Sequence, residues 1–156
     1  MGKLELTEQF VVGIPVIDQQ HLQLVEQINH VIDAYSGGLS RKTIGHLIDK
    51  MVDHAIFHFG FEEQLQELSG YPFLKAHQKS HVQFAKRISD FQTRFNNGDD
   101  ISEYINGLLV EWLSDHLKHD DSDYVALAKE YLLKHPECWC AFKTTQPCAL
   151  NFTQAL

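Results

Sequence analysis

Apolar residues recur along this chain at intervals of three and four positions, the spacing that places side chains on one face of an α-helix. Between residues 19 and 35 these positions are Leu24, Val25, Ile28, Val31 and Ile32. The same periodicity defines five segments: 19–35, 41–68, 73–95, 101 to at least 116, and 124–134. No segment of useful length shows the alternation typical of a strand, so the pattern predicts an all-α protein.

Short runs of turn-forming residues separate the long helical segments. They are Ser36-Gly37-Gly38, Ser69-Gly70-Tyr71-Pro72 and the run 96–100. A glycine with a proline shortly after it ends one helix and allows the next to begin. Helices of about 15–28 residues joined by short turns pack as an up-down-up-down bundle. We therefore expect an antiparallel four-helix bundle with an N-terminal arm and a short C-terminal helix.

Polar residues mark the places where we expect helices to begin. Asp18 and Ser40 can cap the first and second helices, because their side-chain oxygens can accept hydrogen bonds from free N–H groups of the first turn. The cluster Asp120-Asp121-Ser122-Asp123 has the composition of a further cap, which would precede the short helix. Residues 1–17 lack helical periodicity, and we expect them to form an extended arm that packs on the core.

Composition narrows the classes of function. The chain has 156 residues and a formal charge of −8, which argues against a nucleic-acid or anionic-membrane partner. No apolar run approaches the roughly 20 residues of a membrane span, and the N-terminus has no apolar signal core. We expect a cytoplasmic protein in which residues 1–136 form one domain and 137–156 a tail. The tail holds all the cysteines, Cys138, Cys140 and Cys148, an odd number that is not a disulfide framework.

Histidine is the anomaly of the composition, with 10 residues scattered at helical spacings. Two pairs stand four positions apart: His58 with Glu62, and His77 with His81. Four residues are about 400° of helical rotation, so each pair points in one direction. These side chains lie among the apolar stripes, where a polar group must be paired or must bind something.

The candidate ligands are too numerous for one tetrahedral zinc ion and suit two six-coordinate metal ions bridged by carboxylates. They are His21, His58, Glu62, His77, His81, His116 and one of Asp120 or Asp121. On a regular helix Asp120 would be the better partner of His116, because Asp121 is about 140° away and needs an irregular helix. Imidazole and carboxylate together suit iron, zinc or manganese.

The ordered set of motifs resembles the hemerythrin family in its bacterial branch, over about residues 4–134. The motifs are Asp18-x-x-His21, His58-Phe-x-x-Glu62-Glu63, Tyr71-Pro72, His77-x-x-x-His81 and Trp112-Leu-x-x-His116-x-x-x-x-Asp121-x-x-Tyr124. Leu6 departs from the pattern, since bacterial members usually carry a tryptophan in the arm. The tail beyond Pro136 matches nothing in the family.

This resemblance implies a di-iron centre with an oxo or hydroxo bridge. His77, His81 and His116 would bind one iron, and His21 and His58 the second. Glu62 and Asp121, rather than Asp120, would bridge the two, and the second iron would keep an open position for O2. Five residues match positions around the O2 pocket of the family: Leu24, Phe59, Trp112, Leu113 and Leu117.

The resemblance also implies a function, reversible O2 binding for oxygen transport or storage, without enzymatic activity. The alternative is an O2 or redox sensor of the same fold that signals to a protein partner or a fused output domain. A di-iron oxidase or peroxidase is disfavoured, because O2-activating bundles use more carboxylates in Glu-x-x-His motifs. The remaining histidines are expected not to be ligands: His30, His46, His54, His119 and His135. Glu63 is expected to be solvated or to support a ligand, Asp120 to be a surface or capping residue, and Tyr124 to be core or to hydrogen-bond a ligand.

Overall fold

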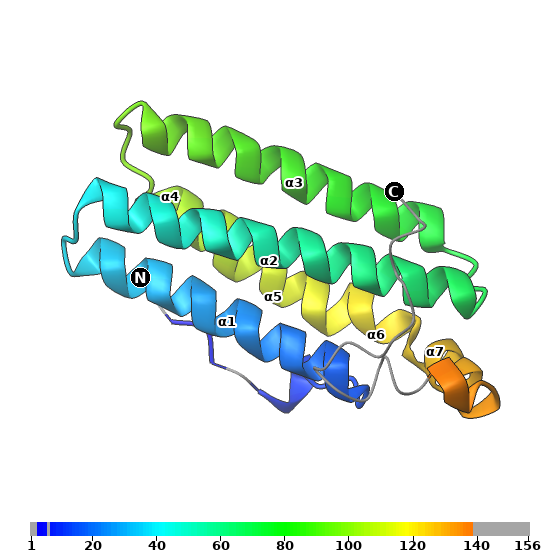
Figure 1. The fold of residues 1–156 in the computed structure, drawn as a ribbon. Helices are drawn as coiled ribbons and strands as arrows, with labels where there is room; N and C mark the ends of the chain where they lie inside the picture. The colour runs from blue at the N-terminus through cyan, green and yellow to red at the C-terminus, as the bar shows by residue number, and fades with distance from the viewer. Residues whose placement is uncertain (1–2, 6, 139–156) are drawn as a thin grey trace.

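The computed structural model describes residues 3–5 and 7–138 and shows four long antiparallel helical columns (Figure 1). Three of them are α1 (Pro15–Ser36), α2 (Arg41–Leu68) and α3 (Leu74–Asn96). The fourth column is a run of segments: α4 (Ser102–Tyr104), the π-helix η2 (Ile105–Trp112), α5 (Leu113–Asp115), the π-helix η3 (His116–Asp120) and α6 (Asp121–Asp123). A short helix, α7 (Val125–Lys134), follows it. No strand occurs in these residues, and the predicted all-α four-helix bundle is confirmed.

The start of α2 agrees with the prediction, whereas the start of α1 does not. Ser40 caps α2, and its Oγ accepts a hydrogen bond from the backbone N–H of Thr43 at 3.2 Å. The first helix begins at Pro15, a turn earlier than predicted, because proline fits the first helical position. Asp18 is therefore not a cap, and its carboxylate instead accepts the backbone N–H groups of Val12 at 2.7 Å and Gly13 at 3.0 Å.

The N-terminal arm packs on the bundle, as predicted, in the part of it that the structure describes. The side-chain amide of Asn29 on α1 donates to the carbonyl of Leu4 at 2.8 Å, and its oxygen accepts from the N–H of Leu4 at 2.9 Å. Phe10 closes the short 3-10 helix η1 (Glu8–Phe10) and is buried. Leu6, the departure from the family pattern, lies outside the described residues, as do Cys140 and Cys148 of the tail.

The acidic cluster 120–123 was wrongly predicted to cap a new helix. The fourth column instead continues through it, from η3 into α6, and ends at Asp123. The short helix then begins at Val125, one residue from its predicted start. The column can run on because residues 116–120 adopt a wider π-helical winding, and this shifts which face each aspartate occupies.

Two hydrophobic clusters fill the interior, and the buried polar residues lie between them along three helices. On α1, His21 follows Ile17 of the smaller cluster and precedes Leu24 of the larger one. On α2, Glu62 lies between Phe59 of the larger cluster and Leu65 of the smaller one. The fourth column repeats this order, with Asp121 between Leu117 and Tyr124, so apolar side chains seal the polar layer on both sides.

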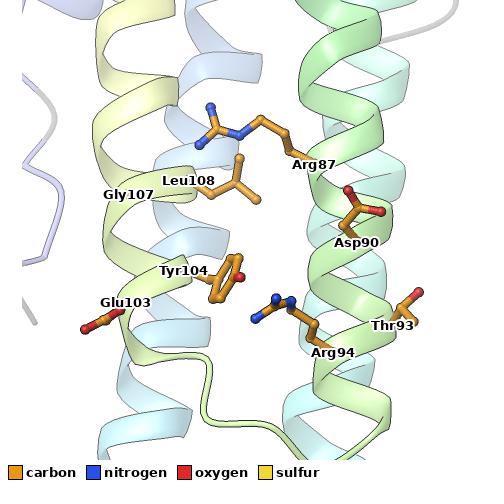
Figure 2. Close-up of a pocket in the computed structure, with 8 residues that line it drawn as sticks. All are labelled: Arg87, Asp90, Thr93, Arg94, Glu103, Tyr104, Gly107 and Leu108. Atoms are coloured by element: carbon orange, nitrogen blue, oxygen red, sulfur yellow. The ribbon is translucent and has the colours of Figure 1, made fainter.

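A surface groove of about 590 Å³ lies on the other half of the bundle, between α3 and the fourth column (Figure 2). Arg94 reaches across it from α3 and places its guanidinium 4.8 Å from the ring centre of Tyr104. Arg87 reaches across one level away, toward Leu108. None of the predicted site residues lines this groove, so the candidate site is the buried polar layer. Within residues 3–5 and 7–138, no helix combines the length and the apolar character needed to cross a bilayer.

Candidate metal centre

The seven residues predicted as ligands converge in the interior of the bundle from all four helical columns. They are His21 on α1, His58 and Glu62 on α2, His77 and His81 on α3, His116 in η3 and Asp121 in α6. All seven are buried. They form two groups that share Asp121, and within each group one nitrogen or oxygen atom per residue lies within 4.8 Å of the others.

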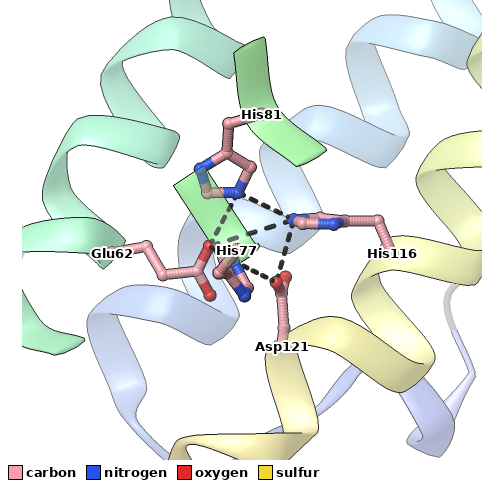
Figure 3. Close-up of side chains that lie close together, drawn as sticks. All are labelled: Glu62, His77, His81, His116 and Asp121. Carbon is pink, nitrogen blue, oxygen red and sulfur yellow. Dashed lines mark hydrogen bonds and ion pairs between the residues drawn. The ribbon is translucent and has the colours of Figure 1, made fainter. Parts of the chain in front are cut away.

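The first group contains three imidazoles and two carboxylates (Figure 3). Glu62 Oε2 lies 3.2 Å from His77 Nε2 and 3.4 Å from His81 Nε2. His116 Nε2 lies 3.0 Å from Asp121 Oδ1. The three Nε2 atoms and both carboxylates therefore face a common centre, a donor set suited to a transition-metal ion.

The second group contains two imidazoles and the other oxygen of the shared aspartate. Asp121 Oδ2 lies 3.1 Å from His21 Nε2 and 3.7 Å from His58 Nε2. Glu62 Oε2 is also 3.8 Å from His58 Nε2. Asp121 thus offers one oxygen to each group, whereas Glu62 places the same oxygen, Oε2, near imidazoles of both groups.

The π-helix η3 brings Asp121, rather than Asp120, to this centre. Its backbone hydrogen bonds run from residue i to i+5, so the fifth residue after His116 returns to the same side of the helix. Asp120 lies on the outer side of the His116 ring, where its Oδ2 accepts a hydrogen bond from Nδ1–H at 3.0 Å. Two consecutive aspartates therefore contact opposite nitrogens of one imidazole. Asp120 is a half-exposed surface residue, one of the two expected roles, and it also holds the His116 ring.

Four of the imidazoles are oriented by an acceptor behind the ring. The Nδ1–H of His21 donates to the backbone carbonyl of Phe10 at 2.8 Å, and that of His58 donates to Gln20 Oε1 at 2.9 Å. The Nδ1–H of His81 donates to Glu63 Oε1 at 2.7 Å, while His116 donates to Asp120 as described. Because each Nδ1–H is held by an acceptor outside the layer, each Nε2 points at the centre, where its lone pair can bind a metal ion once any proton on it has left.

Three features of the centre were not predicted from the sequence. Gln20 was not singled out, although its position beside His21 was a usable signal, and the Phe10 carbonyl has no side-chain signal. Gln66, one turn after Glu62, was also missed. It is fully buried, and neither atom of its amide has a hydrogen-bond partner among the described residues.

The two carboxylates are held in their charged form. Burial raises the pKa of Asp121, but the imidazoles of His116, His21 and His58 outweigh it and hold that pKa well below its usual range. Burial and the nearby Asp121 raise the pKa of Glu62, while His77 and His81 lower it further than this and leave it below its ordinary value. Two buried anions side by side require compensating positive charge.

The imidazoles respond in opposite directions to this pair of anions. Burial lowers the pKa of His116, but Asp121, Asp120 and Glu62 together raise it to about 10. Burial lowers the pKa of His58, and the carboxylates only partly offset this. Burial, reinforced by Glu62 and Asp121, raises the pKa of Tyr124 well above its ordinary value, so its phenol stays protonated in the core.

Unpaired atoms in the layer test whether metal ions fit. The described residues offer no hydrogen bond to His21 Nε2, His58 Nε2, Glu62 Oε1 or either oxygen of Asp121. His21 Nε2 and Asp121 Oδ2 are close, but they are not aligned as donor and acceptor. Each such buried atom costs about 1–3 kcal/mol. Cations would satisfy all of them at once, so the residues fit a two-metal centre.

Aromatic rings form a wall against the imidazoles. Phe59 stacks on His81 with ring centres 4.0 Å apart, and Trp112 stacks on His116 at 4.6 Å. The other predicted pocket residues, Leu24, Leu113 and Leu117, are buried in the same hydrophobic cluster. Phe59 and Trp112 thus contact the imidazoles directly, and the three leucines belong to the hydrophobic cluster that includes Phe59.

The remaining histidines and the described cysteine lie outside both groups. His54, on α2 one turn before His58, is part-buried and stands 3.5 Å from the side chain of Gln27. Cys138 Sγ lies 3.8 Å from the Tyr131 hydroxyl. Neither contributes an atom to the centre.

Comparison with known proteins agrees with this arrangement. Residues 12–128 match the family described as Hemerythrin HHE cation binding domain. A bacteriohemerythrin of Stenotrophomonas maltophilia is 39% identical over 132 residues, which are 85% of this chain and 86% of that protein. A bacteriohemerythrin of Pseudomonas aeruginosa is 42% identical over 125 residues, 80% and 81% of the two chains. A more distant one, from Methylococcus capsulatus, is 26% identical over 74% of this chain and 88% of its own. The resemblance seen in the motifs is confirmed, and the chain belongs to the hemerythrin family of cation-binding domains.

Proposed function

We propose that this protein binds O2 reversibly at a non-haem di-iron centre and serves as an oxygen carrier or store. The observation that carries the proposal is the unequal sharing of imidazoles between two groups joined by the same carboxylates. His77, His81 and His116 would hold one iron, and His21 and His58 the other. Glu62 and Asp121 would bridge them, together with an oxo or hydroxo group.

If Glu62 and Asp121 both bridge, the position with two imidazoles would have one protein donor fewer than the position with three, which leaves room for O2. Two iron ions, when bound, would supply the electrons needed to bind O2. The protein's residues keep this binding reversible by excluding water and anions from the layer. Leu24, Leu113 and Leu117 are each about 1% exposed, which supports a water-excluding role for them in the proposed O2 pocket.

The donor set favours binding over turnover. Five imidazoles and two carboxylates surround the centre, whereas di-iron bundles that activate O2 draw most of their ligands from carboxylates. The relatives that match the chain over most of its length are named bacteriohemerythrins, which is consistent with O2 as the ligand here.

The test is an optical spectrum of the iron-loaded protein, reduced without air and then exposed to O2. We expect a visible band that appears in air and disappears on degassing through repeated cycles. Asp121→Ala, which removes the shared carboxylate, is the negative control. Glu67→Gln, an exposed position on the same face of α2 as Glu63, is the control that keeps the site.

Two other outcomes would overturn the carrier role. Direct passage to an oxidised spectrum, with no reversible band, would favour a redox sensor, and a partner that co-purifies only under O2 would support that reading. Multiple-turnover consumption of a reductant under O2 would indicate an oxidase or peroxidase.

A further inference from the structure

The acceptors behind the imidazoles differ in charge between the two halves of the centre. In the group with three imidazoles, His81 and His116 each donate to a carboxylate, Glu63 at 2.7 Å and Asp120 at 3.0 Å. In the group with two imidazoles, both acceptors are neutral: the Phe10 carbonyl at 2.8 Å and the Gln20 amide at 2.9 Å. The four bonds are similar in length, so charge is what distinguishes them.

Side chains of α3 hold both outer carboxylates in place. Gln78 Nε2 donates to the second oxygen of Glu63 at 3.1 Å, and Ser80 Oγ donates to the same oxygen of Asp120 that His116 contacts, at 3.4 Å. Each carboxylate is thus fixed from two directions. On the half with three imidazoles, these hydrogen bonds run from the buried layer to partly exposed carboxylates. On the other half, Gln20, which accepts the bond from His58, is itself buried.

Any acceptor behind an imidazole fixes the ring and raises the basicity of its free nitrogen, and a charged carboxylate raises that basicity more than a neutral acceptor does. We infer that Glu63 and Asp120 are positioning residues that make the two metal positions electronically unequal. This inference rests on the proposed di-iron function and deepens it. The position with three imidazoles would bind a divalent cation first and, with iron bound, would have the lower reduction potential. The position with two imidazoles, where O2 would bind, would have the higher potential.

The two carboxylates contribute unequally. The side chain of Glu63 is 25% exposed and makes the shorter bond, while that of Asp120 is 49% exposed. Water screens an exposed charge more effectively. Replacement of Glu63 therefore has the larger effect, and Asp120→Asn gives a smaller change in the same direction.

The decisive experiment moves the charge from one half to the other at constant total charge. Glu63→Gln, Gln20→Glu and the double variant are titrated with Co(II), starting from metal-free full-length protein, and the two stepwise affinities are measured by calorimetry. Glu63→Gln is expected to weaken the tighter step by about 10–100-fold and to leave the weaker step unchanged. Gln20→Glu is expected to strengthen the weaker step, so the two affinities of the double variant converge.

Glu67→Gln is the matched control, because it makes the same substitution one turn further along α2 at an exposed position. Circular dichroism of every variant checks that the bundle is folded, and Asp120→Asn supplies a second variant if Glu63→Gln does not fold. A redox titration of the iron-loaded proteins gives an independent reading. There, Glu63→Gln should raise the potential of the ion that is oxidised first.

The outcomes separate this inference from the proposed function. If Glu63→Gln, Asp120→Asn and Glu67→Gln all leave the stepwise affinities and the potentials unchanged, the inference is wrong while the two-metal centre stands. If the unaltered protein binds fewer than two ions, the proposed function itself fails.

Discussion

Helix α2 and the fourth helical column both present a histidine and a carboxylate to the centre, but they do so with different windings. On α2, His58 and Glu62 are four residues apart on a regular α-helix. On the fourth column, His116 and Asp121 are five residues apart across the π-helix η3. On a regular helix, sequence spacing alone predicts which two residues share a face. On a π-helix it does not, because the rule of 3.6 residues per turn no longer applies.

The irregular winding also adds a contact that a regular helix cannot offer. Asp121 Oδ1 lies 3.0 Å from His116 Nε2, and Asp120 Oδ2 lies 3.0 Å from His116 Nδ1. Consecutive residues thus hold the two sides of one ring. On α2 these two tasks are divided between helices, because His58 has Glu62 as its neighbour on α2 but Gln20 of α1 behind its ring.

The largest expected effect on metal binding comes from deleting one residue in each of the two helices, because a deletion changes the spacing of the histidine and the carboxylate. Deletion of Gly60 rotates everything after it on α2 by about 100°, which turns Glu62 and the buried residues after it away from the interior. We expect loss of both metal ions and of much of the stability. Deletion of His119 turns the five-residue spacing into four, which a regular helix presents on one face. We expect that variant to keep both ions, with affinities within roughly tenfold, or about 1.4 kcal/mol, of the original.

Metal analysis and thermal unfolding measure both deletions. His119 is an exposed residue, so its removal costs little packing, and Gly60 is likewise exposed, which makes the pair comparable. Equal loss of metal in both variants would show that the π-helical winding is required for more than the placement of Asp121.

The next largest effect separates the two aspartates. Asp121→Ala leaves buried imidazoles without their anion, and removal of one partner from a buried charged set costs about 3–5 kcal/mol. We expect loss of metal and a lower melting temperature. Asp120→Ala removes only a partly exposed acceptor and should retain both ions, as shown by elemental analysis of the purified proteins. Retention of two ions by Asp121→Ala would remove it from the proposed ligands.

The hydrophobic wall gives a third, smaller contrast. Leu113→Ala should keep iron but speed autoxidation, since a shortened side chain admits water to the centre. Its loss of stability should be about 2–5 kcal/mol. Leu109→Ala is the matched control, because Leu109 is equally buried on the same column, one turn further from His116. Optical spectra recorded over time in air measure the autoxidation rates of both variants. If both variants autoxidise alike, Leu113 has no particular place in the O2 pocket.

The regular parts of the molecule could be predicted from the sequence, and the irregular parts could not. Periodicity located α2 with both ends correct, and Ser40 was identified as its cap. The prediction that Asp18 caps the first helix was wrong, because the helix begins earlier, at Pro15. Residue spacing alone does not show which backbone N–H groups a carboxylate will bind. The choice of Asp121 came from family resemblance rather than from helix geometry. The Phe10 carbonyl behind His21 depends on the path of the arm, which no local pattern specifies.

The smallest expected effect is the release of protons when a metal ion binds. It should differ between His116 and His58, because their pKa values are shifted in opposite directions. Asp121, Asp120 and Glu62 outweigh burial and raise the pKa of His116 to about 10, while burial lowers the pKa of His58. In the metal-free protein the proton on His116 contributes stability that is complete below the ordinary histidine pKa of about 6.5 and is lost as the pH rises through 10.

A metal ion must displace this proton from His116 at neutral pH, but it meets His58 already neutral. Zn(II) binding should therefore release protons and tighten as the pH rises, as calorimetry in two buffers of different ionisation enthalpy would show. Asp120→Asn removes one of the groups that raise the pKa of His116 and should reduce the release, whereas an unchanged release would mean that the proton leaves from another group.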